Sequence, residues 1–366
     1  MNFTCNRELL QKCVVNAERV TGKNLSLPIL SSVFLATSNK SLIIRATNLE
    51  VGVELQIPAD IKTEGNIAIP GALLSSILNN IPDEENITVI ANNGVCKIIT
   101  KSKNITIKGF VPDDFPTIPN ITDEESFTLS TSKFLQGVKS VLMSAAVSDV
   151  KPEISSVYIY KDTKAIVFVA TDSFRLAEKR IEYNNDKVFT GLIVPIKNII
   201  ELVKIFENTN EELFFKITKT QISCVGKNIY ATSRAIQGIY PDYQQIIPKK
   251  HTTEIVVLKQ DLLNAIKLST LFSDKFNKIQ INIDPTNKKC IVSTKNSDIG
   301  ETETSLSATI SGDPIETLLN GKHLFDCLGG IERDSLVLEF NESNKPVVIK
   351  GLGDPSYTYL TMPLTK

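Results

Sequence analysis

A short pattern occurs three times in this chain at a nearly constant distance. An apolar, strand-like run leads into a threonine and a polar stretch at Thr47–Asn48, Thr171–Asp172 and Thr294–Asn296. The three threonines are 124 and 123 residues apart, which is the length of a small domain. The spacing therefore predicts a threefold repeat of domain-sized units and argues against a solenoid of short repeats.

Other segments keep the same period and the same order along the chain. Phe3-Thr4 precedes one predicted helix, and Phe127-Thr128, 124 residues later, precedes another. The stretch 109–113 (Gly-Phe-Val-Pro-Asp) has a counterpart at 238–242 (Gly-Ile-Tyr-Pro-Asp), and the third copy keeps little of it. A series of matching segments in the same order and at the same spacing is hard to produce by accident. We therefore expect three domains, at residues 1–122, 123–249 and 250–366.

The composition is typical of a soluble globular protein. Hydrophobic residues make up 42% of the 366, enough for a core in each unit. No apolar run reaches the roughly 18 residues of a membrane span, and no signal segment is recognisable, so we expect a cytoplasmic protein without a membrane partner. The six cysteines are scattered and only two histidines occur, which indicates neither a disulfide framework nor a zinc site. The net charge of −1 does not indicate a nucleic-acid partner and does not exclude one.

Hydrophobic periodicity predicts two helices and several strands in each unit. Leu10, Val14 and Ala17 share one helical stripe, Asn6 is suited to cap that helix, and Gly22 is placed to stop it. Helices are expected at 6–20, 72–80, 132–147, after Pro195, 260–271 and 322–328. Strands are expected at 42–46, 51–57, 87–90, 96–100, 105–107, 165–168, 213–217, 222–224, 229–231, 279–283, 290–293, 301–308, 335–340, 347–350 and 357–362. The predicted fold class is α+β, with helices on one side of antiparallel sheet.

Motifs of the common enzyme classes are absent from the sequence. There is no Gly-x-Gly-x-x-Gly, no Walker-type loop and no Gly-x-Ser-x-Gly elbow. His251 lies at a joint between units and His323 lies in a short helix, and each is expected to be structural or solvated rather than catalytic. Thr171–Asp172 could pair a nucleophile with a base, but its recurrence as Thr47–Asn48 favours a turn at the end of a strand. We therefore expect a protein that is not an enzyme and needs no cofactor.

Four short motifs are individually weak but jointly specific. They are Leu27-Pro28-Ile29-Leu30, the segment 170–177 (Ala-Thr-Asp-x-x-Arg-Leu-Ala), Pro241-Asp242-Tyr243 and Met362-Pro363-Leu364. In this order they resemble the bacterial DNA polymerase III beta subunit family, the sliding clamps, over the whole chain. The resemblance implies three repeated DNA-clamp-like domains, each with two helices packed on antiparallel sheet.

The resemblance further implies a role in DNA replication. Two chains would pair head to tail into a homodimeric ring around double-stranded DNA, bound without regard to sequence. Such a processivity factor is opened by a clamp-loader complex and tethers the DNA polymerase III catalytic subunit. Other DNA polymerases and repair proteins with short clamp-binding peptides are implied as further partners.

A hydrophobic peptide-binding groove between the second and third units is also implied. Carried over by motif, its residues are Ile154, Thr171, Phe174, Arg175, Leu176, Pro241, Gln245, Ile246, Met362, Pro363 and Leu364. Gln245 stands where the family often has Arg, and Phe174 where it often has His or Tyr, so polar contacts at the rim are expected to differ. The alternative is that these residues only seal a core, and for Leu176 the two interpretations weigh equally.

A DNA-facing surface is implied on the helices. Lys12 with Arg19, and Lys197 with Lys204, are each seven residues apart, so each pair shares a helix face. The residues that the resemblance places near DNA are Lys12, Arg19, Lys23, Asn24, Lys139, Ser148, Lys197, Lys204, Lys267 and Lys322. Phosphate contacts alone are independent of sequence and weakened by salt, as sliding requires. The alternative, an ordinary solvated face, is favoured for the helix that begins Gly71–Leu74, which lacks basic residues.

Opposite charges beside apolar side chains favour a head-to-tail contact between the first and third units. The residues expected at this dimer interface are Lys101, Lys103, Ile105, Ile107, Leu271, Phe272, Glu301 and Glu303. With three units per chain, two chains would close a ring. The alternative is that the lysines only protect an exposed edge strand from aggregation.

Two other classes of function remain open from the sequence. A DNA-processing enzyme would need a metal–carboxylate or nucleophile constellation, and nuclease, polymerase and ATPase assays would detect it. A monomeric scaffold would keep the groove without the ring, and its sedimentation mass would distinguish it.

Overall fold

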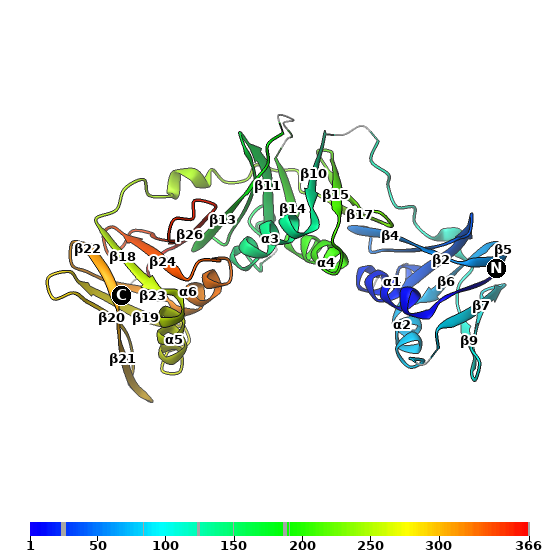
Figure 1. Cartoon of the computed structure of the whole chain (residues 1–366), viewed down its shortest axis with the longest axis horizontal. Coiled ribbons are helices and arrows are strands. Elements are labelled where there is room, and N and C mark those ends of the chain that lie inside the picture. The colour runs from blue at the N-terminus through cyan, green and yellow to red at the C-terminus, as the bar shows by residue number, and fades with distance from the viewer. Residues whose placement is uncertain are drawn as a thin grey trace. The chain divides into compact units, whose positions relative to one another are not determined.

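The computed structural model of the chain describes residues 1–22, 27–82, 84–122, 125–148, 150–185, 189 and 191–364. The chain forms two compact units, called unit 1 and unit 2 from here on, which differ from the three units of the sequence repeat (Figure 1). Unit 1 comprises Met1–Ser132 with Lys197–Ala235, and unit 2 comprises Lys133–Ile196 with Ile236–Lys366. The middle third of the chain therefore contributes to both units. No helix among the described residues is long and apolar enough to cross a membrane.

Unit 1 contains two antiparallel sheets. The eight-stranded sheet has the order β10 (Glu125–Ser130), β15 (Glu212–Ile217), β16 (Gln221–Val225), β17 (Ile229–Arg234), β4 (Val51–Pro58), β3 (Ser41–Thr47), β2 (Ser32–Ser38) and β6 (Gly65–Pro70). The five-stranded sheet has the order β5 (Asp60–Thr63), β1 (Asn2–Asn6), β7 (Asn86–Asn92), β8 (Val95–Ile99) and β9 (Asn104–Lys108). Its helices are α1 (Arg7–Val20), α2 (Gly71–Asn79) and nearly all of α4 (Ile196–Phe206). Figure 1 shows α1 and α2 side by side, and α1 also contacts β3 and β4.

Unit 2 repeats this plan with two further antiparallel sheets. The nine-stranded sheet has the order β14 (Leu192–Pro195), β11 (Ser156–Asp162), β12 (Ala165–Thr171), β13 (Arg175–Glu182), β26 (Tyr357–Thr361), β25 (Val347–Gly351), β24 (Ser335–Phe340), β18 (Thr253–Leu258) and β22 (Ala308–Gly312). The four-stranded sheet has the order β21 (Gly300–Leu306), β20 (Lys289–Asn296), β19 (Lys278–Asp284) and β23 (Ile315–Asn320). Its helices are nearly all of α3 (Thr131–Val141), α5 (Lys259–Thr270) and α6 (Gly321–Leu328).

Strands from consecutive thirds of the chain share a sheet in both units. In unit 1, β17 pairs with β4, and Ala231 lies opposite Val53. In unit 2, β13 pairs with β26, and Leu176 lies opposite Leu360. These pairings continue the hydrogen-bonded ladder from one repeat into the next, so no sheet edge is left exposed at either junction.

The first helix, Arg7–Val20, agrees with the predicted range 6–20, but the residue expected to stop it does not do so. The Asn6 side chain accepts a hydrogen bond from the Leu9 amide at 3.0 Å, which confirms the predicted cap. Gly22 is not the helix stop, because the helix ends at Val20 and Thr21 adopts an extended backbone. The Thr21 amide and hydroxyl both donate to the Glu18 carbonyl, which satisfies the last turn without a left-handed residue.

Two further boundaries differ from the predicted ones. The helix expected at 132–147 becomes a 3₁₀ turn at Leu142–Ser144, and the Ala146 amide then donates to the Ile154 carbonyl rather than into the helix. The strand expected at 301–308 is two strands, because the chain leaves β20 after Leu306 and pairs with β18 from Ala308 onward. Periodicity within the segment is the same on both sides of this switch, so only the tertiary pairing reveals it.

Candidate functional site

The turn between β12 and β13 is built by its own side chains. The Thr171 hydroxyl donates to the Arg175 carbonyl at 2.7 Å, and Asp172 Oδ1 accepts the amides of Phe174 and Arg175, both at 2.9 Å. Ser173 between them has a φ of 78°. Thr171 and Asp172 thus satisfy backbone groups of a tight turn, which confirms the turn predicted in place of a nucleophile–base pair.

The same turn occurs between β3 and β4 in unit 1. There the Thr47 hydroxyl donates to the Val51 carbonyl at 2.9 Å, and Asn48 Oδ1 accepts the amides of Glu50 and Val51. Leu49 has a φ of 75°, close to that of Ser173. In the third copy the Thr294 hydroxyl instead donates to the Lys278 carbonyl, so the turn is not repeated there.

Arg175 links this turn to a helix far along the chain. Its guanidinium Nε lies 2.9 Å from Asp172 Oδ2, and one terminal nitrogen lies 2.6 Å from Asp326 Oδ2 on α6. Burial alone would lower the pKa of Arg175, but the hydrogen bond to Asp326 and the negative charges beside it raise that pKa above its ordinary value. The side chain is only 10% exposed, so its main role in the free protein is to hold Asp172 and Asp326 together.

The C-terminal segment runs past the turn after β26 ends. The Met362 amide donates to the Phe174 carbonyl, and the Leu364 amide donates to the Leu318 carbonyl on β23, both at 2.8 Å. Met362, Pro363 and Leu364 are all half-buried. These bonds hold the apolar segment 362–364 between the Phe174 turn and β23.

An apolar cluster lies beneath the turn and the tail. Its buried members are Ala165, Val167, Val169, Leu176, Ile193, Tyr240, Tyr243, Val348 and Leu360, with Met362, Ile236 and Ile247 packed against them. The segment that follows Pro241 is anchored to it, because the Tyr243 hydroxyl donates to Glu178 Oε2 at 2.5 Å and lies 2.8 Å from the Tyr160 hydroxyl. The Tyr158 ring stacks on that of Tyr240. A rigid apolar base therefore supports the more exposed residues above it.

The residues predicted for the groove fall into three exposure classes. Phe174, Pro241, Gln245 and Ile246 are exposed, and the exposed fractions of Phe174 and Ile246 are 64% and 52%. The half-buried residues of the predicted groove are Ile154, Met362, Pro363 and Leu364. Those that are buried are Thr171, Arg175 and Leu176. All of them belong to unit 2. The large exposed apolar side chains are the ones that a docked peptide could reach directly.

Sequence reasoning assigned no role in this site to the tyrosines that support it, although Tyr240 and Tyr243 stand in the motifs quoted above. Tyr240 and Tyr243 flank the Pro241-Asp242 motif, and Tyr158 and Tyr160 alternate along one strand. That alternation was a usable signal, because residues two apart in a strand lie on the same face. Gln245 donates to Asp242 Oδ2 at 2.6 Å and so folds back onto its own loop.

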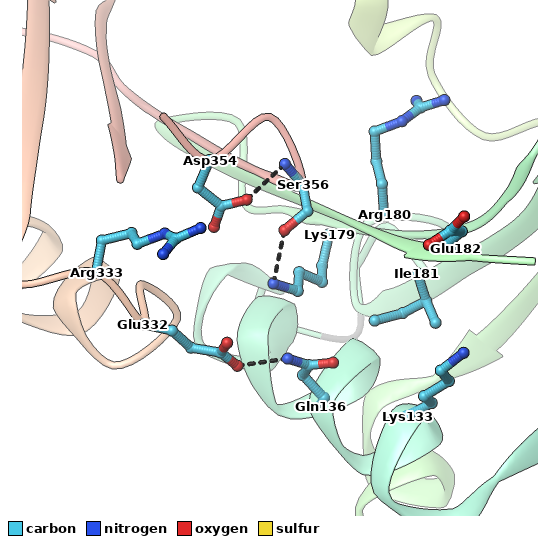
Figure 2. Close-up of a pocket in the computed structure, with 10 residues that line it drawn as sticks. All are labelled: Lys133, Gln136, Lys179, Arg180, Ile181, Glu182, Glu332, Arg333, Asp354 and Ser356. Atoms are coloured by element: carbon cyan, nitrogen blue, oxygen red, sulfur yellow. Dashed lines mark hydrogen bonds between the residues drawn. The ribbon is translucent and has the colours of Figure 1, made fainter. Parts of the chain in front are cut away.

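A separate cavity of about 490 Å³ lies elsewhere in unit 2 (Figure 2). Lys179 is 3% exposed and donates to the Ser356 hydroxyl at 3.0 Å. Burial would raise the pKa of Asp354, but hydrogen bonds from Ser356 and the charges of Lys179 and Arg333 lower it below its ordinary value. None of the residues predicted for the groove lines this cavity, whose charges largely offset one another.

Three family models match consecutive parts of the chain. They describe the DNA polymerase III beta subunit N-terminal domain at residues 1–119, its central domain at 128–242 and its C-terminal domain at 244–365. The chain belongs to the DNA polymerase III beta subunit family. The fold class predicted from the sequence is confirmed: three domains of this family, with few helices on antiparallel sheets.

Relatives and solved structures match this beta subunit family member over its full length. The beta sliding clamps of Synechococcus elongatus and Vibrio cholerae are 25% and 24% identical to it; each match covers 100% of this chain and at least 99% of the relative. The sliding clamp structure from Bacillus subtilis is 22% identical with a TM-score of 0.95, over 100% of this chain and 99% of that one. The DNA polymerase III subunit beta structure from Pseudomonas aeruginosa is 23% identical with a TM-score of 0.94, over 100% of both chains.

The residues predicted to face DNA are spread over both units of this beta subunit family member. Lys12, Arg19, Lys197 and Lys204 lie on α1 and α4 of unit 1, and Lys139, Ser148, Lys267 and Lys322 lie in unit 2. Ion pairs within one helix join Lys12 to Glu8, Lys204 to Glu201 and Lys322 to Asp326. Lys23 and Asn24 lie outside the described residues.

The residues predicted for the dimer interface lie at two sheet edges and at the end of α5. Lys101 and Lys103 precede β9, the edge strand of the five-stranded sheet, whereas Glu301 and Glu303 lie on β21, the edge of the four-stranded sheet. Leu271 at the end of α5 is 72% exposed, and Phe272 is half-buried. Ile105 is half-buried and Ile107 is 3% exposed, so Ile107 already packs into its own unit.

Proposed function

We propose that this chain is a DNA sliding clamp, a processivity factor that catalyses no reaction itself. The observation that carries the proposal is the ordered match of all three beta-subunit domain models over residues 1–365. In this function the clamp loader places it on DNA in the cytoplasm, and it tethers the DNA polymerase III catalytic subunit, other DNA polymerases and repair proteins. We retain the domain boundaries at 122/123 and 249/250 as part of this proposal.

In the proposed function, two chains in head-to-tail contact form a ring that encircles duplex DNA. Support comes from two of the edge strands: unit 1 offers β9 with Lys101 and Lys103, and unit 2 offers β21 with Glu301 and Glu303. Edge strands of opposite charge can extend one another's sheets across an interface. A contact between two different surfaces is heterologous, and such contacts form a closed ring when the rotation from one chain to the next permits it.

The partner peptide docks over the Thr171 turn in this function. Support comes from a rigid base, Leu176 and Tyr243, beneath exposed apolar side chains, Phe174 and Ile246, with half-buried Met362 beside them. A flexible methionine and a fixed proline suit an apolar slot that accepts several related peptides. Because Arg175 is held by two carboxylates, its contribution to binding is mainly to position the turn.

Topology rather than charge retains the clamp on DNA in this function. The net charge of −1, together with the three lysines paired on their own helices, supports only weak contacts to phosphates. Such contacts are independent of sequence and are lost as salt rises. A closed ring can therefore slide on circular DNA without dissociating from it.

Retention on circular DNA tests this function. Protein assembled by a clamp loader on nicked circles is passed through a sizing column at moderate salt, before and after one restriction cut. We expect the protein to elute with the circles and to be released after linearisation. Rapid loss from intact circles would contradict the ring, and nuclease, polymerase or ATPase activity of the purified chain would contradict a non-catalytic role.

A further inference from the structure

Two glutamates face each other across neighbouring strands of unit 2. In the antiparallel pair of β18 and β24, Glu254 lies directly opposite Glu339. Like charges in directly opposite positions destabilise a sheet. The Glu254 and Glu339 side chains are 35% and 18% exposed, so water only partly screens them. The pair therefore favours a cation at this position.

A histidine adds a nitrogen to the two carboxylates. His251 Nε2 lies 3.5 Å from Glu254 Oε2. One possible ligand atom from each of His251, Glu254 and Glu339 lies within 4.8 Å of the other two. These residues are separated by three positions and by 85 along the chain (254 − 251 and 339 − 254), so only the pairing of β18 with β24 brings them together.

We propose that His251, Glu254 and Glu339 bind a divalent transition-metal ion, with zinc as the representative metal. Imidazole nitrogen with carboxylate oxygen is a ligand set that zinc accepts, whereas magnesium and calcium favour oxygen alone. Three protein ligands leave a fourth position for water. A hollow of about 500 Å³ lined by both glutamates provides that space and a route of entry. The proposal does not depend on the clamp function.

Lys350 competes with the metal for one of the ligands. Its Nζ lies 3.0 and 3.1 Å from the two oxygens of Glu339 and neutralises that carboxylate. No ion pair of Glu254 other than that with His251 occurs among the described residues. A metal bound here must therefore draw one Glu339 oxygen away from Lys350, which limits the affinity of the site. Removing the lysine charge should consequently tighten metal binding.

Zinc titration of the full-length protein tests the proposal. After treatment with a chelator and dialysis, zinc chloride is titrated by calorimetry into the wild type and into His251→Ala, Glu254→Gln and Lys350→Met. We expect one zinc ion per chain in the wild type, at least about tenfold weaker binding in the first two variants, and tighter binding in the third. The first two replaced side chains are partly exposed, and circular dichroism checks that each variant is folded.

The second histidine of the chain provides a matched control. His323→Ala should bind zinc as the wild type does, because His323 lies on α6 and is not part of the cluster. A cobalt(II) absorption spectrum that changes in His251→Ala but not in His323→Ala would support the site independently. The proposal is wrong if the wild type binds no zinc, or if His251→Ala binds it as tightly as the wild type.

Discussion

A single guanidinium holds together two distant parts of unit 2. Arg175 joins the turn after β12 to α6 through Asp172 and Asp326, whose side chains are 18% and 14% exposed. Breaking a buried ion pair leaves an uncompensated charge in a poorly hydrated site, which costs more than the pair itself contributed. The turn that we propose as a docking site therefore depends on a contact made beneath it.

Arg175→Met should lower the free energy of unfolding of unit 2 by about 3–5 kcal/mol. Arg45→Met is the matched control, since its ion pair with Glu54 is 37% and 35% exposed and should contribute about 0–1 kcal/mol. Urea unfolding followed by circular dichroism measures both. Equal losses in the two variants would mean that burial does not strengthen the Arg175 contacts.

The stability of the protein should fall as the pH is lowered through the range in which His323 titrates. Burial first, and then the positive charge of Arg175, lower the pKa of His323 below its ordinary 6.5. Between that lowered value and about 6.5 the unfolded chain binds more protons than the folded chain, so acidification favours unfolding. In His323→Gln the fall in melting temperature from about pH 7.5 to about pH 5.5 should be shallower.

At the scale of elements, the segment after β26 links a strand to a turn of another repeat. Its backbone bonds from Met362 to Phe174 and from Leu364 to Leu318 place apolar side chains beside the exposed Phe174. The β13–β26 pairing that precedes the segment is a regular ladder and does not depend on it. The tail can therefore be removed without loss of the sheet.

Deletion of residues 362–366 should abolish binding of a peptide that carries the glutamine and leucine or phenylalanine of clamp-binding motifs. The dimer should persist, because no residue of the predicted interface is removed. Fluorescence anisotropy of a labelled peptide and sedimentation velocity measure the two properties. A shorter deletion, of 365–366 only, should retain binding since both backbone bonds remain. Near-normal affinity after the longer deletion would place the peptide site elsewhere.

At the scale of the whole molecule, the proposed dimer depends on surfaces that a single chain leaves exposed. The Leu271 side chain is 72% exposed at the end of α5, near the edge strand β21 that carries Glu301 and Glu303. Isolated apolar side chains at a surface are common, but one beside an unpaired strand edge favours an interface.

Leu271→Ala combined with Phe272→Ala should convert the dimer into folded monomers. Apolar truncations at packed sites cost about 2–5 kcal/mol each, and a loss of about 4 kcal/mol weakens association roughly a thousandfold. Leu73→Ala on α2, where the leucine is 48% exposed, is the matched control and should leave the dimer unchanged. Sedimentation equilibrium at low concentration measures the mass. A dimer mass for the double variant would move the interface away from α5.

Local features of the fold were readable from the sequence. The Asn6 cap, the 335–340 strand and the Thr171 turn depend on neighbours within a few residues, and periodicity or hydrogen-bonding side chains identify them. The repeat was identified by its constant spacing along the chain, and the α+β class by the order of the predicted elements. The last residue of the first helix was also predicted, but not how the helix ends, because Gly22 was expected to stop it and Thr21 satisfies its last turn instead.

From the sequence, the candidate site could be predicted only as a set of residues implied by the resemblance to the family. Leu176 could equally be core or surface in the sequence, and its complete burial follows from pairing with Leu360, far along the chain. The same is true of Glu254 and Glu339, whose opposition follows from the β18–β24 register. Short-range patterns specify which face of a strand is apolar, but only long-range packing decides which strands meet. The sequence alone therefore determined the repeat, the family and those elements that local patterns specify, and the tertiary structure decided where some elements end and which side chains share a site.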